Sequence, residues 1–359
     1  MKRTVYKNLV IDDILTDLTA EDGVIVSLER TTEDGYDCKG LTARAGLFDV
    51  HIHGLIGEDA NANDGTLDKM SLALAKEGVT SWLPTVSPAS FDDMEKACKA
   101  VSHAGAKVRG FHLEGPFVSL AKKGALNPIH IVPPTTELLD RCPRATYMTI
   151  APETEGAIEF IKEATKRGVR LALGHSVATH DEALAGIRAG ANSLTHTFNA
   201  MAPLDHREPG LIGAAITGDA YVQVISDGFH LHPAVVLALY RIFGAERMML
   251  ISDSVRPAGL PEGVYESSGK VVEVRNGQCY LKDSNTIAGA TTLLSECVRR
   301  AVSFGIPEAD AYRMASETPA RFMGVKAGKL ALGYDADFAL YSKTNHAVLT
   351  VIDGEIVEF

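Results

Sequence analysis

Metal-binding or acidic side chains follow five short apolar runs in this chain, at the points where strands of a parallel barrel would end. They are the His-x-His pair His51 and His53, then Glu114, His175, His196 and Asp253. Because the carboxyl ends of parallel barrel strands converge on one rim, such residues can surround one ion although they lie far apart in the sequence. Imidazole and carboxylate suit zinc and similar divalent ions, so the pattern indicates a metal-assisted hydrolase.

The first two positions offer three metal ligands. His51 and His53 are two residues apart on a predicted strand, so both side chains point to the same side of it and can hold one ion. Glu114 precedes a Gly-Pro turn, and its two carboxylate oxygens can bridge two ions, although an acid there can also cap a helix. His112, two residues earlier, is expected to have a structural role.

The remaining positions complete the candidate site. His175 and His196 each resemble ordinary buried histidines when taken alone, but their places at consecutive strand ends favour a set with Glu114. Asp253 could take a proton from water and pass it to a leaving group, or it could simply cap a helix.

Two loop residues are candidates for substrate binding. Arg207 follows the sixth predicted strand, and its guanidinium could bind phosphate through two parallel hydrogen bonds. A surface salt bridge to Glu208 is the alternative for Arg207. His230, just past the seventh strand, could contact the substrate or cap the following helix.

Short apolar runs alternate with helical patterns from Leu47 onward, which is typical of repeated βα units. The eight predicted strands cover residues 47–53, 79–85, 108–113, 147–151, 169–174, 193–195, 221–225 and 248–252. The predicted helices include residues 67–77, 92–103, 157–166, 181–189 and 233–243. Eight such units predict a distorted TIM-type (β/α)8 barrel, with a doubly wound sheet as the rival.

Both ends of the chain have a different pattern. Residues 1–46 and 328–359 contain short β-runs separated by turns such as Asp22-Gly23 and Asp353-Gly354. We therefore expect a small discontinuous β-sandwich domain built from both ends, and a barrel over residues 47–327.

Composition excludes several classes of protein. Hydrophobic residues make up 46% of the 359 residues and charged residues 23%, as in ordinary globular proteins. No apolar stretch reaches the roughly 18 residues that a membrane span requires. A formal net charge of −11 argues against nucleic acid or an anionic membrane as a partner. The five cysteines are widely spread without a C-x-x-C pair, and no export signal is recognisable, which favours a reducing cytoplasm.

Several segments together resemble a known family. They include Leu113-Glu114-Gly115-Pro116, His196-Thr197-Phe198-Asn199-Ala200-Met201, Arg207-Glu208-Pro209-Gly210, Thr286-Ile287-Ala288-Gly289 and Gly333-Tyr334-Asp335-Ala336-Asp337. In this order, and with the His-x-His pair, they resemble the N-acetylglucosamine-6-phosphate deacetylases of the amidohydrolase superfamily. The match runs through almost the whole chain and is more specific than His-x-His alone.

The resemblance implies a role for each candidate residue. Glu114, His175 and His196 would hold the main metal, His51 and His53 match the form of the family that can bind a second ion, and Asp253 would be the acid/base. The metal would be one or two divalent ions per subunit, expected to be zinc, with iron or another ion as the alternative. Substrate contacts would come from Ala125, Asn199, Ala200, His230, Ile287, Ala288 and Gly289. Arg207 would reach the phosphate in the neighbouring subunit of a homodimer.

The chain departs from the family at one position. Leu126 stands where the family usually has a histidine that contacts the substrate, and the nearby His130 is a conceivable replacement. Arg256 could add a cation near the site. The expected reaction is the deacetylation of N-acetylglucosamine 6-phosphate in amino-sugar catabolism. The alternatives are N-acetylgalactosamine 6-phosphate, another N-acyl substrate, or a sugar-phosphate-binding protein without catalysis.

Overall fold

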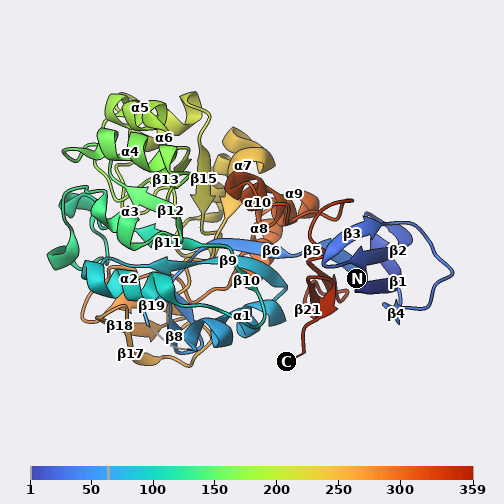
Figure 1. Cartoon of the computed structure of the whole chain (residues 1–359). Helices are drawn as coiled ribbons and strands as arrows, with labels where there is room; N and C mark the ends of the chain where they lie inside the picture. The colour runs from blue at the N-terminus through green and yellow to red at the C-terminus, as the bar shows by residue number, and fades with distance from the viewer. Residues whose placement is uncertain (1, 63–64, 359) are drawn as a thin grey trace.

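The computed structural model describes residues 2–62 and 65–358, and its larger part is a nearly closed parallel barrel (Figure 1). The barrel strands are β6 (Leu47–Ile52), β9 (Val79–Val86), β11 (Phe111–Glu114), β12 (Ala145–Ile150), β13 (Arg170–Leu173), β14 (Ser193–Leu194), β15 (Tyr221–Val224) and β16 (Met248–Leu250). They pair in this order, and the backbone N–H of Asp253, just past β16, donates to the carbonyl of His51 in β6 at 2.9 Å. The predicted (β/α)8 barrel is confirmed, and the doubly wound alternative is wrong.

The third predicted strand, residues 108–113, is interrupted. It is divided into β10 (Lys107–Val108) and β11, with Gly110 between them at a φ of 132°. A Cβ at Gly110 would lie 2.2 Å from the Thr146 hydroxyl oxygen, so only glycine allows this close approach of the two segments.

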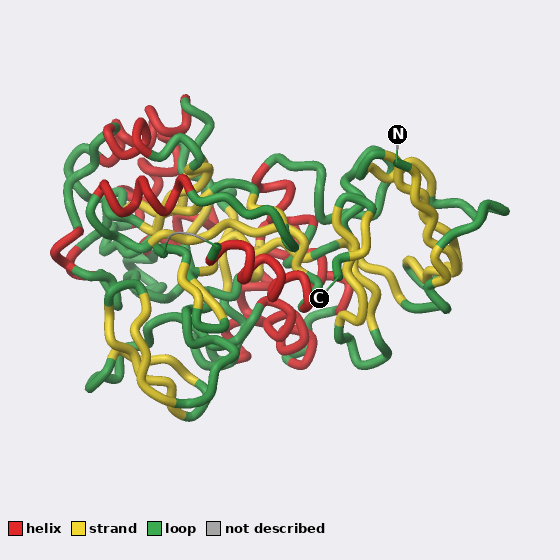
Figure 2. The backbone as a smooth tube through the Cα atoms, turned by 60° about the horizontal axis from the view of Figure 1, so that its bottom comes forward, coloured by secondary structure: helices red, strands yellow, loops and turns green. Residues whose placement is uncertain are grey.

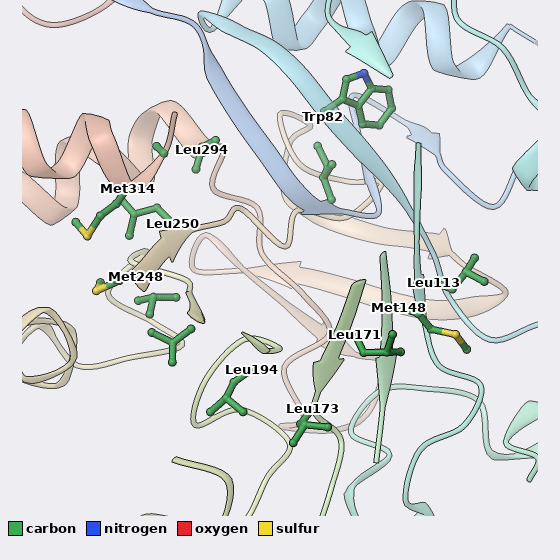
Figure 3. Packing of buried hydrophobic residues seen from close by; sticks show 14 of the residues in the cluster. Trp82, Leu113, Met148, Leu171, Leu173, Leu194, Met248, Leu250, Leu294 and Met314 are labelled. Carbon is green, nitrogen blue, oxygen red and sulfur yellow. The ribbon is translucent and has the colours of Figure 1, made fainter. Parts of the chain in front are cut away.

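Alternate residues of the strands fill the two sides of the barrel wall. Phe48, Leu83 and Met249 belong to a buried cluster inside the barrel. Their neighbours Leu47, Trp82 and Leu250 belong to the larger cluster that also contains residues of the helices. Figure 3 shows Trp82 and Leu250 in this cluster. Because side chains alternate along a strand, every strand contributes side chains to the interior of the barrel. The side chains at the carboxyl ends of the strands lie together on one rim.

The helices surround this wall. They are α1 (Thr66–Lys76), α2 (Phe91–Lys99), α3 (Glu137–Arg141), α4 (Ala157–Lys166), α5 (His180–Ala189), α6 (Gly210–Thr217), α7 (Pro233–Arg247), α8 (Leu294–Ser303), α9 (Glu308–Met314) and α10 (Glu317–Met323). Short 3₁₀ turns η1 (Leu120–Lys122) and η2 (Pro128–His130) lie after β11. In the described parts of the chain, none of these helices is long and apolar enough to cross a membrane.

Helix α2 ends earlier than the predicted residues 92–103. Ala100 has extended backbone angles, and the next residues fold back onto α1. There the Ser102 hydroxyl donates to Asp68 Oδ1 at 2.9 Å, and the His103 N–H donates to the same oxygen. These tertiary contacts therefore replace the last turn of the predicted helix.

Strands from both ends of the chain form a separate sheet beside the barrel (Figure 2). It contains β1 (Arg3–Ile11), β2 (Ile14–Glu21), β3 (Val24–Ser27), β4 (Tyr36–Asp37), β5 (Thr42–Ala45), β20 (Phe338–Tyr341), β21 (Ala347–Ile352) and β22 (Glu355–Ile356). The predicted turns Asp22-Gly23 and Asp353-Gly354 have positive φ at all four residues, as tight hairpin turns require.

A partly buried charge cluster joins this sheet to the barrel. The Lys107 ammonium lies 2.9 Å from Asp337 Oδ1, and Arg109 Nη2 lies 3.2 Å from Asp337 Oδ2. The Asp337 side chain is fully buried, and its Oδ1 also accepts the backbone N–H of Asp353 at 2.8 Å. The closing Gly-x-x-Ala-Asp motif therefore ties the two parts together.

Replacing Asp337 with alanine is expected to lower the free energy of unfolding by about 3 kcal/mol, because Lys107 and Arg109 would lose a buried counter-charge. Asp353→Asn is the matched control, since its side chain is 64% exposed and the change should cost about 1 kcal/mol or less. Chemical denaturation of both variants measures the difference, and equal losses would contradict the structural role of Asp337.

Two small antiparallel sheets were not predicted from the sequence. The antiparallel strands β17 (Gly263–Ser267), β18 (Lys270–Arg275) and β19 (Gln278–Leu281) are inserted between β16 and α8, and a small hairpin of β7 (Gly54–Leu55) and β8 (Glu58–Asp59) follows β6. Ser268-Gly269 connects β17 to β18, and Asn276-Gly277 connects β18 to β19. All four residues have positive φ, so these dipeptides are a hairpin signal that is visible in the sequence.

Candidate metal centre

Four histidines and one glutamate converge at the carboxyl ends of the barrel strands. Glu114 Oε1 lies 3.2 Å from His175 Nε2 and 3.0 Å from His196 Nε2. Its Oε2 lies 3.2 Å from His53 Nε2, and its Oε1 lies 3.4 Å from His51 Nε2. The five residues are buried and form two groups with metal-ligand spacing, which share Glu114.

The outer ring nitrogens of two of the histidines have oxygen acceptors, whereas His196 Nδ1 is buried without a hydrogen-bond partner. His51 Nδ1 lies 3.0 Å from Gln223 Oε1, while the Gln223 amide donates to the Tyr147 hydroxyl at 2.8 Å. His175 Nδ1 lies 2.8 Å from the carbonyl of Lys122. A histidine that donates from Nδ1 keeps the lone pair on Nε2, which is the arrangement that metal-binding histidines commonly have.

The inner ring nitrogens of each histidine pair face each other at short distance. His51 Nε2 and His53 Nε2 are 3.2 Å apart, and His175 Nε2 and His196 Nε2 are 3.1 Å apart. In the neutral rings, lone pairs on these nitrogens could bind a cation that also contacts the Glu114 carboxylate. The donor set therefore fits a divalent metal.

Backbone strain accompanies this convergence. His175, His196 and Asp253 lie two or three residues beyond the ends of β13, β14 and β16, and their φ angles are 47°, 26° and 49°. Residues other than glycine rarely adopt positive φ, and such conformations cluster at functional sites where the surrounding structure enforces them. Each turn directs its side chain back over the rim.

Asp253 lies beside the histidine pair. Its Oδ1 is 3.4 Å from His51 Nε2 and 3.5 Å from His53 Nε2, and the residue is only 7% exposed. The position puts a carboxylate next to the histidine cluster and at the wall of the cavity above it. From there it could exchange a proton with a water bound in the cavity.

His112 lies beneath the cluster and has partners on both ring nitrogens. Thr85 Oγ1 is 3.1 Å from His112 Nδ1, and Thr149 Oγ1 is 2.9 Å from His112 Nε2. Complete burial holds the pKa of His112 well below its usual range, so the ring is neutral. These contacts agree with the structural role expected for His112.

A cavity of about 370 Å³ opens above the cluster. The predicted substrate residues that line it are Ala125, Asn199, Ala200, His230, Ile287, Ala288 and Gly289. The ring of His230 is oriented by Asp227, whose Oδ2 lies 2.7 Å from His230 Nδ1. Burial alone lowers the pKa of His230, but the Asp227 carboxylate more than offsets it, so the net pKa is raised.

Other lining residues were not found by sequence reasoning. They include Ser87, Ser267, Ser268, Lys270, Val272 and Asn285. Leu126, which the sequence analysis singled out, also lines the cavity. Ser87 is linked to the cluster, because its hydroxyl lies 3.1 Å from His53 Nδ1. Gln223 was also missed, although a polar residue within the apolar strand β15 is a visible signal.

Two residues considered from the sequence lie elsewhere. His130 lines a separate surface hollow with Phe91 and Ile129, so it does not replace the histidine absent at Leu126. The Arg256 guanidinium donates from Nε to the carbonyl of Gly57 at 2.8 Å rather than entering the cavity. The structure therefore provides no support for a cation from Arg256 at the site.

Arg207 is exposed and outside the cavity of its own chain. Among the described residues, no ion pair joins it to Glu208, whose Oε1 accepts the backbone N–H of His180 at 2.7 Å. The alternative of a local salt bridge is therefore wrong.

Comparison with known proteins agrees with this geometry. A model of the amidohydrolase family matches residues 42–357. The chain belongs to the amidohydrolase family. It is 36% identical over 330 residues to the N-acetylglucosamine-6-phosphate deacetylase of Bacillus subtilis, covering 87% of this chain and 83% of the relative. It is 34% identical over 359 residues to the N-acetylgalactosamine-6-phosphate deacetylase of Escherichia coli O157:H7, covering 95% and 94%.

Solved amidohydrolase structures have the same fold. The N-acetylglucosamine-6-phosphate deacetylase from Pasteurella multocida superposes with a TM-score of 0.92 at 29% identity, covering 99% of both chains. A variant of the Mycobacterium smegmatis enzyme in complex with N-acetyl-D-glucosamine-6-phosphate has a TM-score of 0.89 at 28% identity, covering all of both chains. The predicted membership of this group of amidohydrolases is confirmed.

Proposed function

We propose that this amidohydrolase removes the acetyl group from N-acetylglucosamine 6-phosphate, giving glucosamine 6-phosphate and acetate, as a step of amino-sugar catabolism. The observation that carries the proposal is the Glu114 carboxylate shared by two histidine pairs, with Asp253 beside them under a cavity of sugar-phosphate size. Relatives with this activity span most of the chain, which supports the same chemistry here.

Glu114, His175 and His196 would hold one divalent ion, and His51 and His53 with Glu114 would hold a second. Bound there, a metal would polarise the amide carbonyl and lower the pKa of a bound water to about 7. We propose zinc, because imidazole nitrogen and carboxylate oxygen are its usual ligands.

Asp253 would move the protons of the reaction. Its carboxylate takes a proton from the attacking water as the new carbon–oxygen bond forms. It then gives this proton to the amine nitrogen as the carbon–nitrogen bond breaks, so the products are an amine and acetate. The burial of Asp253 beside the histidines keeps it within reach of both atoms.

The sugar would be held by residues that line the cavity around the histidine cluster. Asn199 and Ala200 contribute a side chain and backbone next to the histidines, and the segment Ile287–Gly289 faces them. Because Asp227 holds His230 Nδ1, the other ring nitrogen of His230 is available to donate to the substrate. The raised pKa of His230 favours a cationic ring, which suits an anionic sugar phosphate.

Arg207 would complete the site from the neighbouring subunit of a homodimer. The residue is exposed and does not line the cavity of its own chain, which supports an intermolecular role. A guanidinium is well suited to phosphate, because it can form two parallel charge-assisted hydrogen bonds.

Arg207→Ala is expected to raise KM for the phosphorylated substrate by about 10- to 100-fold, because this is the usual effect of losing one hydrogen bond to a charged group. Turnover of unphosphorylated N-acetylglucosamine should not change. Steady-state kinetics with both substrates makes the test, and Arg241→Ala, an exposed arginine on α7, is the control. An unchanged KM would contradict the phosphate role of Arg207.

N-acetylgalactosamine 6-phosphate is the second candidate substrate. The observation in its favour is the Escherichia coli relative of that name, which matches 95% of this chain. Leu126 adds to it, because the wall of the cavity has an apolar side chain where a substrate-binding histidine is usual in the family.

Acetate release from the two N-acetylated hexosamine 6-phosphates by metal-loaded protein decides between these candidates. Faster release from the glucosamine form would support the proposal, and faster release from the galactosamine form would support the alternative. Binding of either sugar phosphate without acetate release would instead identify a non-catalytic binding protein.

We further propose that the enzyme acts in the cytoplasm. All five cysteines are unpaired and buried, which suits a reducing compartment. Cell fractionation with an antibody against the chain would test this, and recovery outside the cytoplasmic fraction would contradict it.

A further inference from the structure

The inserted sheet β17–β19 covers one side of the cavity. Its inner face carries Val272, Val274 and Cys279, which form a buried cluster with Val255 and Ala288. Val271, directly before Val272, is 50% exposed, so the strand alternates between the cavity side and solvent. The same alternation turns Lys270, two residues before Val272, toward the cavity, which it lines.

Two polar side chains of this hairpin face the cavity together. Ser267 and Lys270 are directly opposite each other across the turn, so both side chains lie on one face of the sheet. Ser267 is 3% exposed, and its hydroxyl oxygen is buried without a hydrogen-bond partner. In the described parts of the chain, no hydrogen bond or ion pair within 4 Å involves the Lys270 ammonium.

The turn that presents them is anchored to the barrel rim. Asp59, in β8, accepts the backbone N–H of Ser268 at 2.7 Å and the Ser268 hydroxyl at 3.1 Å. Asp59 is 6% exposed, so these hydrogen bonds are protected from water. They fix the place of the next strand, and with it the place of Lys270.

Lys270 lines the same cavity as Glu114 and Asp253. Burial lowers the pKa of Lys270, and the carboxylates of Glu114, Asp59 and Asp253 offset this only in part, so the net pKa is lowered. Glu114 and Asp253 belong to the reacting end, whereas Arg207 is the residue proposed for the phosphate. A desolvated ammonium and a desolvated hydroxyl without partners are unfavourable unless a ligand accepts from them.

Leu126 lines the same cavity and has no hydrogen-bond donor on its side chain. We propose that Lys270, assisted by Ser267, donates to the acyl oxygen of the substrate and so supplies the donor that Leu126 lacks. Negative charge develops on this oxygen as water adds to the amide carbon, and a preorganised cation stabilises it. Lys270 stays protonated throughout and forms no covalent bond. This inference rests on the proposed deacetylase function.

Lys270→Met is expected to lower kcat/KM by about 100-fold or more, the usual loss when one oxyanion donor is removed. Lys282→Met is the matched control, because Lys282 is exposed on the same inserted sheet and lies outside the cavity. Ser267→Ala should lose about 10-fold, as expected for one neutral hydrogen bond. Unchanged kcat/KM in Lys270→Met would overturn the inference.

A double-variant cycle separates a donor from a merely structural lysine. Leu126→His should restore much of the activity lost in Lys270→Met and add little to the parent enzyme, because the two donors would serve one oxygen. Additive effects of the two substitutions would overturn the inference. Metal content, measured in each variant, should equal that of the parent.

Acetate binding tests Lys270 independently of turnover. Calorimetry should show that metal-loaded parent protein binds acetate more tightly than metal-loaded Lys270→Met does. Equal affinities would overturn the inference. If the parent protein released no acetate from any sugar phosphate, the deacetylase proposal would fail, whereas the acetate comparison would still decide whether Lys270 binds an acyl oxygen.

Discussion

Asp253→Asn should lower kcat by about 10³-fold or more, since the loss of general acid–base catalysis costs about 10²–10⁴-fold and Asp253 is proposed for both proton transfers. Asparagine keeps the shape of the side chain and tolerates the φ of 49° at this position, so the backbone turn should survive. Acetate release at saturating substrate measures the effect, and binding of the sugar phosphate should be retained.

Asp219→Asn is the matched control for this experiment. Asp219 has a φ of 55° and lies in an exposed loop, where it pairs with Arg247 at 3.2 Å. The same chemical change in the same backbone conformation should leave kcat unaltered there. Full activity in Asp253→Asn would refute the proposed proton transfers and would require another base in the cavity.

Most of the barrel could be predicted because its strands are short apolar runs that end at polar residues. The structure keeps each predicted strand within a few residues, and α4 matches its predicted bounds. The predicted bounds of strands and helices were wrong where contacts with distant parts of the chain determine the local conformation. Gly110 interrupts a strand because Thr146 packs against it, and α2 ends early because Asp68 binds the backbone beyond it.

The identity of the candidate metal ligands could be predicted from the sequence, but their arrangement in space could not. Residue types at strand ends identified the histidines, whereas the sharing of Glu114 between two pairs depends on closure of the barrel. Lys270 could not be recognised, because a lysine after a Ser-Gly turn usually lies in solvent. Its position over the cavity depends on Asp59, which is more than 200 residues away in the sequence.

Because Glu114 belongs to both metal groups, its replacement should affect both ions, whereas the replacement of one histidine should affect only one. Glu114→Gln removes a charged ligand from both groups, whereas His53→Asn removes a neutral ligand from one. Because even an indirect partner of a metal ligand is worth about 10- to 100-fold in metal affinity, the loss of Glu114 should weaken binding by more than about 100-fold. We therefore expect Glu114→Gln to bind almost no metal and to have no measurable turnover.

Metal analysis after dialysis and thermal unfolding with and without chelator measure this difference. A metal present at about 1,000 times its Kd stabilises a folded protein by about 4 kcal/mol, so chelator should lower the Tm of the parent but hardly that of Glu114→Gln. His53→Asn should lose no more than one ion per chain, and Glu155→Gln, an exposed glutamate, should lose none. Full metal content in Glu114→Gln would contradict the shared site, because it would mean that the histidines alone hold the ions.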